Sequence, residues 1–121
     1  MSAPANLNAT EPMRLYIAGP MSGIEGLNHP AFHAAAARLR HAGFVVENPA
    51  ENAEPCQNPT WDDWMALSLA QLARCDGVAL LPGWSLSRGA GIEFSEALRA
   101  GKRARPLNDW LGADAGQGAA A

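Results

Sequence analysis

Short apolar runs alternate along the chain with longer segments in which apolar residues recur at helical spacing. The runs are brief, rich in β-branched and large apolar side chains, and end at Gly, Pro or polar residues, which is typical of buried strands. The expected strands are 14–18, 44–47, 78–81 and a weaker one at 103–107. The expected helices are about 29–42, 61–72 and 89–100. This alternation predicts an α/β fold with a parallel sheet covered by helices on both faces.

Residues that start and stop helices support these boundaries. Asn28 can cap the first helix, and Gly43 is a natural stop after it. Thr60 is a good N-cap for the second helix, with Asp63 three residues later as the acidic half of a capping box. The third helix should partly bury its apolar residues, which are Ile92, Phe94, Ala97 and Leu98.

A length of 121 residues suits one domain with one core. We expect a flexible leader at 1–12, the domain at 13–111 and a Gly/Ala-rich disordered tail at 112–121. The leader lacks the apolar core of a signal peptide, and no run approaches the ~18 apolar residues of a membrane span. A cytoplasmic protein without a membrane partner is the expectation.

Charge and metal-binding residue types exclude several functions. The net charge is −3 and the basic residues are scattered, so a nucleic-acid partner is not expected. Cys56 and Cys75 form no CxxC pair; Cys75 should be buried and Cys56 exposed. His29 and His33 are four apart and could share a helix face as metal ligands. Since no third ligand follows at a suggestive spacing, we expect no metal.

Ligands of such sheets bind beyond the carboxyl ends of the strands, here the loops at 19–26, 48–59 and 82–91. The third loop opens a helix, whose free amides and dipole favour negative charge. Ser22 and Ser87 lie in the glycine turns and suit a phosphate, to which Arg88 could add a charge-assisted contact. The turn is neither a Walker A loop nor a GxGxxG motif.

Glu93 lies about one turn inside that helix, where the dipole should stabilise its ionised form. An ionised carboxylate there could attack an anomeric carbon; the structural alternative is a glutamate placed only for the dipole. Tyr16 in the first strand could donate to Glu93, or it could be a core tyrosine with another partner. Trp61 and Trp64 could stack on a base, but their helical spacing favours core or loop packing.

Three motifs in order resemble the nucleoside 2-deoxyribosyltransferase superfamily, which includes the 2'-deoxynucleoside 5'-phosphate N-hydrolases. They are Leu15-Tyr16-Ile17-Ala18-Gly19-Pro20, Cys75-Asp76-Gly77-Val78-Ala79-Leu80-Leu81, and Gly89-Ala90-Gly91-Ile92-Glu93 followed by Glu96-Ala97 and Gly101-Lys102. The resemblance covers about residues 14–107. It is greatest to a small bacterial and phage branch with the same Gly-Pro-Met-Ser-Gly and Pro-Gly-Trp…Ser-Arg-Gly-Ala signatures.

The resemblance implies a flavodoxin-like three-layer sandwich, with a parallel sheet of four or five strands, in homodimers or larger homo-oligomers. It implies that Glu93 is the nucleophile that attacks C1' and that Tyr16 orients it. Ser87, six residues before the nucleophile, matches the serine that helps bind a 5'-phosphate in the N-hydrolases. No cofactor or metal is implied. Ser68 stands where family members often carry an aspartate that helps the base to leave.

The expected function is therefore cleavage or transfer at the N-glycosidic bond of a (deoxy)nucleoside 5'-phosphate through a glycosyl-glutamate intermediate. The alternative is a nucleotide-binding or sensing module on the same fold with weak or no turnover, which Ser68 favours. The expected catalytic residues are Glu93 and Tyr16. The expected substrate-binding residues are Gly19, Pro20, Met21, Ser22, Ser87, Arg88, Gly89 and Gly91.

Overall fold

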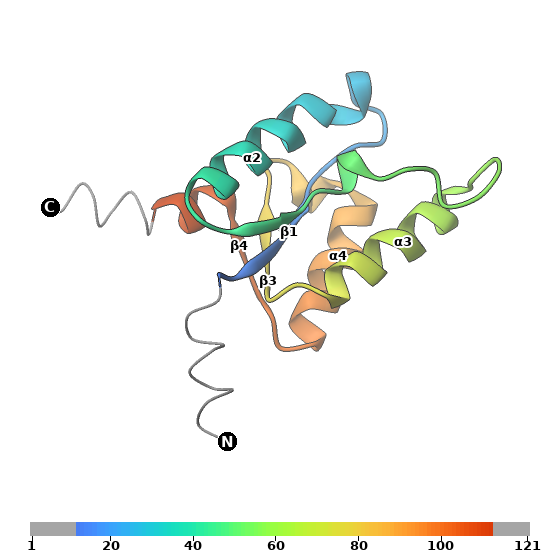
Figure 1. Cartoon of the computed structure of the whole chain (residues 1–121). Helices are drawn as coiled ribbons and strands as arrows, with labels where there is room; N and C mark the ends of the chain where they lie inside the picture. The colour runs from blue at the N-terminus through green and yellow to red at the C-terminus, as the bar shows by residue number, and fades with distance from the viewer. Residues whose placement is uncertain (1–11, 113–121) are drawn as a thin grey trace, which may run out of the picture.

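The structure, a computed structural model, describes residues 12–112 and contains one parallel sheet of four strands (Figure 1). The strands are β1 (Arg14–Ala18), β2 (Val45–Glu47), β3 (Gly77–Leu80) and β4 (Arg103–Pro106). Their spatial order is β2-β1-β3-β4, and all neighbouring pairs are parallel. Apart from residues 12 and 112, the predicted leader and tail lie outside the described residues.

Helices cover both faces of the sheet, so the fold is the predicted α/β three-layer sandwich (Figure 1). The main helices are α2 (His29–His41), α3 (Trp61–Ala73) and α4 (Arg88–Arg99). Leu15 and Ile17 pack with α2 residues such as Phe32 on one face. Tyr16 and Ala18 point to the other face, into the cluster that contains residues of α3 and α4. The period-2 alternation of β1 thus separates two apolar layers.

The strand order changes direction between β1 and β3. The chain leaves β1 through α2 to reach β2 on one side, and it later returns through α3 to β3 on the other side. Connections that diverge from a central strand leave a crevice at the carboxyl ends of the strands. No helix within the described residues is long and apolar enough to cross a bilayer.

Most predicted boundaries agree with the structure within one or two residues. The Thr60–Asp63 capping box is present, Cys75 is buried and Cys56 is exposed. Asn28 is the N-cap residue of α2, as predicted, but its side chain makes no capping hydrogen bond and donates instead to the Pro20 carbonyl at 2.9 Å. Asn28 itself lies in the left-handed region with a φ of 61°.

The predicted inner face of α4 needs correction. Ala90, Glu93 and Ala97 are its buried residues, and Phe94 is half-buried. Ile92 and Leu98 point outward and remain 38% and 54% exposed. The helix is therefore rotated about its axis relative to the predicted orientation. Ala90 and Ala97 pack into the apolar cluster against the sheet, and Glu93 is the third inward residue.

Lys102 connects the end of α4 to the end of α3. Its Nζ donates to the carbonyls of Leu72 and Ala73 at the end of α3 and to the carbonyl of Cys75 in the turn before β3. We expect Lys102→Met to lower the free energy of unfolding by about 1–3 kcal/mol, because those carbonyls lose a charged donor. Urea denaturation measures this change, and an unaltered midpoint would show that water replaces the ammonium without loss.

Candidate active site

A cavity of about 450 Å³ opens beyond the carboxyl ends of β1 and β3. Its walls come from β1, the loop after it, the start of α2, the loop after β2, α3 and the first turns of α4. Apolar and aromatic side chains dominate the lining, and a few polar groups interrupt it. The lining residues are Tyr16, Gly19, Met21, Ser22, Leu27, His29, Phe32, Pro49, Asn52, Glu54, Trp61, Trp64, Met65, Ser68, Ser87, Gly89, Ala90 and Glu93.

Gly19 forms part of this cavity because two strand ends approach each other there. A Cβ at Gly19 would lie 2.8 Å from Leu81 Cβ, closer than side chains tolerate. Gly89 serves the same purpose between two helices, since a Cβ there would lie 3.2 Å from Met65 Sδ of α3. Both glycines therefore hold the walls of the cavity close together.

Tyr16 and Glu93 form the only polar pair buried within this cavity's described lining. The Tyr16 hydroxyl donates to Glu93 Oε2 at 2.6 Å, across 77 positions of sequence. Tyr16 is fully buried in β1, and Glu93 is only 6% exposed on the inward face of α4. The hydrogen bond proposed from the sequence is present, and it joins the strand and the helix that the site requires.

Burial controls the protonation of Glu93. Desolvation raises its pKa to about 7, and the hydrogen bond from Tyr16 opposes that rise. The sequence analysis considered only the helix dipole, which favours the ionised form, and not the burial that raises the pKa of Glu93. The desolvation of the buried carboxylate disfavours its charged form by more than the hydrogen bond from the Tyr16 hydroxyl favours it.

Tyr16 remains a phenol over the whole working range of pH. Its burial and the neighbouring Glu93 carboxylate raise its pKa well above 10, and the Ser68 hydroxyl acts in the opposite direction. Tyr16 is thus a permanent donor to Glu93. Ser68, which replaces the aspartate expected from the family resemblance, lines the cavity beside this pair.

The start of α4 supplies polar groups at another wall of the cavity. Ser87 is the N-cap residue, and its Oγ accepts from the Ala90 amide at 3.2 Å. The hydroxyl proton of Ser87 stays available as a donor, since the cap uses the oxygen only as an acceptor. This hydroxyl at a helix N-terminus matches the environment predicted for an anion.

Three of the predicted substrate-binding residues do not line the cavity. Pro20 lies beside it and holds Asn28 through its carbonyl. Arg88 and Gly91 lie on the outward face of α4. Arg88 contacts the site only indirectly, through its guanidinium 4.2 Å from the ring centroid of Trp61. The other predicted residues, Gly19, Met21, Ser22, Ser87 and Gly89, all line the cavity.

Sequence analysis included the loop at 48–59 among the expected ligand-binding loops but named none of its residues as part of the site. Asn52 lines the cavity, and Gln71 holds its amide through reciprocal hydrogen bonds of 2.6 and 2.9 Å. Gln71 in turn donates to Glu47 at 3.1 Å, which orients both amides because a carboxylate only accepts. Glu54 and His29 also line the cavity. Only the position of Asn52 and Glu54 in a loop after a strand could have indicated them.

The histidines do not meet a third ligand. The rings of His29 and His33 are 6.0 Å apart, and His33 Nδ1 lies 3.3 Å from the Asn48 amide. Within residues 12–112, no three His, Cys, Asp or Glu side chains are grouped as metal ligands would be. The cavity can thus supply a buried carboxylate that ionises near neutral pH, a phenol donor, aromatic walls and a helix N-terminus.

Comparison with known proteins identifies the family of this chain. No curated protein matches it. The family model described as "Domain of unknown function (DUF4406)" matches residues 13–104, which include every element from β1 to α4 and both Tyr16 and Glu93. The chain therefore belongs to this DUF4406 family.

Proposed function

We propose that this protein cleaves the N-glycosidic bond of a (deoxy)nucleoside 5'-phosphate, with Glu93 as the nucleophile. The observation that carries the proposal is the 2.6 Å hydrogen bond from Tyr16 to Glu93 at the buried end of a largely apolar cavity. A buried carboxylate with one fixed donor and one open side is suited to attack on a sugar carbon. The resemblance of these motifs to the nucleoside 2-deoxyribosyltransferase superfamily supports the same roles.

The cavity walls fit the parts of a nucleotide. Trp61 and Trp64 offer aromatic surface on which a base can stack. Ser87 at the N-terminus of α4 offers a donor and a favourable dipole to a 5'-phosphate. Glu93 lies six residues after Ser87, between one and two turns into the same helix, so a sugar between phosphate and base would lie beside it.

The reaction proceeds in two displacements. A Glu93 carboxylate oxygen forms a bond to C1', the C1'–N bond breaks, and its electron pair leaves with the base, which takes up a proton. Water then attacks C1', the bond to Glu93 breaks, and the carboxylate is restored with release of the sugar phosphate and a proton. Tyr16 holds the attacking carboxylate in place throughout, because its hydroxyl donates to the other oxygen.

The described lining of the cavity contains no obvious acid to protonate the departing base. Ser68 occupies the position at which the resembling family often carries an aspartate, and a serine hydroxyl is a poor acid at neutral pH. The proton must then come from water or another group. Cleavage should therefore be faster for substrates whose base is a better leaving group.

A panel of deoxynucleotides, ribonucleotides and the matching nucleosides tests the proposal. Chromatography should detect free base from at least one 5'-phosphate and less from its nucleoside, because the nucleoside lacks the anion for the α4 N-terminus. Absence of free base from every substrate, including those with activated leaving groups, would overturn the proposed reaction.

A binding or sensing module is the second candidate, and Ser68 together with the raised pKa of Glu93 favours it. Such a module would hold a nucleotide in the same cavity without turnover. Its signature is a rise in Tm with nucleotide concentration and no free base. If no nucleotide of the panel raises the Tm at any concentration, this candidate is excluded.

The pH profile of base release should report Glu93. We expect kcat/KM to increase with pH through about 7, because only the ionised carboxylate attacks. Tyr16→Phe should move this inflection to higher pH, since the hydrogen bond that lowers the Glu93 pKa is lost. Comparison of the two profiles on one substrate removes the ionisation of the substrate itself. Coincident inflections would contradict the role of Tyr16.

A further inference from the structure

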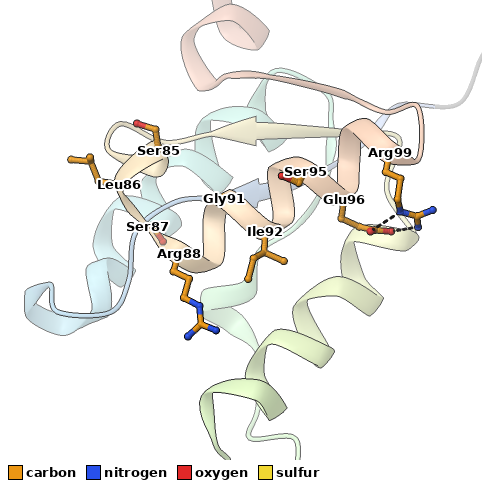
Figure 2. A pocket seen from close by; sticks show the side chains of 9 residues that line it. All are labelled: Ser85, Leu86, Ser87, Arg88, Gly91, Ile92, Ser95, Glu96 and Arg99. Atoms are coloured by element: carbon orange, nitrogen blue, oxygen red, sulfur yellow. Dashed lines mark hydrogen bonds and ion pairs between the residues drawn. The ribbon is translucent and has the colours of Figure 1, made fainter.

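The charged side chains that line the cavity are acidic. Within the described lining there is no lysine or arginine, whereas two carboxylates, Glu54 and Glu93, are present. The basic side chains of α4 lie outside the cavity. Figure 2 shows Arg88 and Arg99 on the outward side of the helix, with Arg99 turned toward Glu96. Away from the α4 N-terminus, the cavity therefore suits a part of the ligand that donates hydrogen bonds.

One of these carboxylates, Glu54, belongs to the loop after β2, and Gln71 of α3 holds that loop in place. Gln71 is only 6% exposed, and its amide forms the reciprocal hydrogen bonds with Asn52. Its Nε2 also donates to Glu47, the last residue of β2, which two arginines hold through ion pairs. The loop is thereby tied both to α3 and to the end of β2.

These hydrogen bonds allow the amide of Asn52 a single orientation. Both hydrogens of Gln71 Nε2 are used, one by the Glu47 carboxylate and one by Asn52 Oδ1. Gln71 Oε1 must then face Asn52 Nδ2, and the two atoms are 2.6 Å apart. If the amide of Asn52 turned over, N–H would face N–H and oxygen would face oxygen. Asn52 thus keeps one hydrogen and one lone pair for a ligand, at places that cannot be exchanged.

The proposed reaction directs the base toward this loop. A nucleophile approaches C1' opposite the bond that breaks, so the base lies on the far side of C1' from Glu93. The strand order β2-β1-β3 puts α4, which follows β3, and the loop after β2 on opposite sides of β1. A sugar that presents C1' to Glu93 on α4 therefore places its base near Asn52 and Glu54.

The groups on this side of the cavity distinguish an amino group from a carbonyl group. The Glu54 carboxylate only accepts, so it can bind the exocyclic amino group of cytosine or adenine. It repels the carbonyl oxygen that uracil or hypoxanthine carries at the same ring position. Asn52 cannot compensate by turning its amide over. His29 also lines the cavity, but an imidazole can donate or accept and so favours neither kind of base.

We propose that the loop after β2 recognises the base and selects nucleotides whose base carries an exocyclic amino group. Glu54 accepts from that amino group, and Asn52 supplies a second contact of fixed polarity. Gln71 and Glu47 are positioning residues, since they act on the base only through Asn52. The inference rests on the proposed function for the placement of the base, but it concerns binding and is measured separately from turnover.

Matched pairs of nucleotides test this preference. They are deoxycytidine against deoxyuridine 5'-phosphate, and deoxyadenosine against deoxyinosine 5'-phosphate; within a pair the sugar and phosphate contacts cancel. Calorimetric titration of the full chain should give a Kd about tenfold lower for the amino member of every pair that binds. Equal or reversed affinities would overturn the inference.

The same nucleotides separate this inference from the proposed reaction. Selective binding without free base would support the inference and overturn the reaction, whereas release of base without preference would support the reaction and overturn the inference. Failure of every nucleotide to bind would overturn both.

Glu54→Gln tests the acceptor, with Asp62→Asn as the matched control. Glutamine keeps the shape of the side chain but gains a donor, so the preference for the amino member should fall to about threefold or less. Asp62 is an exposed carboxylate of α3 that does not line the cavity, so its variant loses the same charge and should keep the wild-type preference. An unchanged preference in Glu54→Gln would overturn the role of Glu54.

Gln71→Leu tests the positioning role. Leucine removes both hydrogen bonds to Asn52, so the amide can turn over and the carbonyl member should gain affinity relative to the amino member. A merely structural role would weaken both members equally and leave their ratio unchanged. Circular dichroism verifies folding, and Asn52→Ala, which removes the amide itself, should also lower the ratio. An unchanged ratio in these variants would overturn the roles of Asn52 and Gln71.

Discussion

Glu93→Gln is expected to stop the release of free base, with kcat reduced roughly 10³-fold or more. The amide keeps the shape of the carboxylate and can still accept from the Tyr16 hydroxyl, but its oxygen is a poor nucleophile toward C1'. Binding should persist, because the aromatic walls and the start of α4 are unchanged. The loss should therefore appear in kcat and not in the nucleotide concentration that stabilises the protein.

Two measurements make this result specific. Wild-type protein quenched during turnover should carry the added mass of one sugar phosphate, and Glu93→Gln should carry none. Asp109→Asn, which neutralises an exposed carboxylate beyond β4, controls for a general effect of charge loss and should keep wild-type kcat. A Glu93→Gln variant that releases base at the wild-type rate would assign the nucleophile to another residue.

Local signals explain why the strands and helices could be predicted. β1 is a short apolar run closed by Gly-Pro, and α3 starts at a Thr60–Asp63 capping box that forms within four residues. The orientation of α4 could not be found in this way. Its inward face consists of two alanines and Glu93, so the larger apolar residues on the other face dominated the periodicity.

The Tyr16–Glu93 pair could be anticipated, but its energetics could not. Sequence position and the family resemblance indicated that the strand end and the helix start meet. Whether Glu93 is charged depends on how completely α3 and the loops exclude water from it, and that is a property of the assembled cavity. Asn52 is a similar case, because its position depends on Gln71, 19 residues away.

Burial of Glu93 also implies a cost in stability that depends on pH. The pKa of Glu93 is about 7 in the folded chain, against 4.5 for an unperturbed glutamate. The folded state thus holds a proton that the unfolded state has released, so stability falls as pH rises from about 4.5 through 7. The raised pKa corresponds to about 3 kcal/mol between the two limits. Glutamine at this position does not titrate, so the stability of that variant does not fall with pH for this reason.

We therefore expect Glu93→Gln to gain stability relative to the wild type by about 2–3 kcal/mol between pH 5 and pH 8.5. Urea denaturation at several pH values measures this difference, and other titrating groups cancel because both proteins share them. Glu25→Gln removes an exposed carboxylate and is the matched control for the loss of one acidic side chain. A pH-independent difference for Glu93→Gln would mean that Glu93 ionises in the folded protein as it does in water. Combined with a lost kcat, the predicted gain would show that the site gives up stability at neutral pH to keep a reactive carboxylate buried.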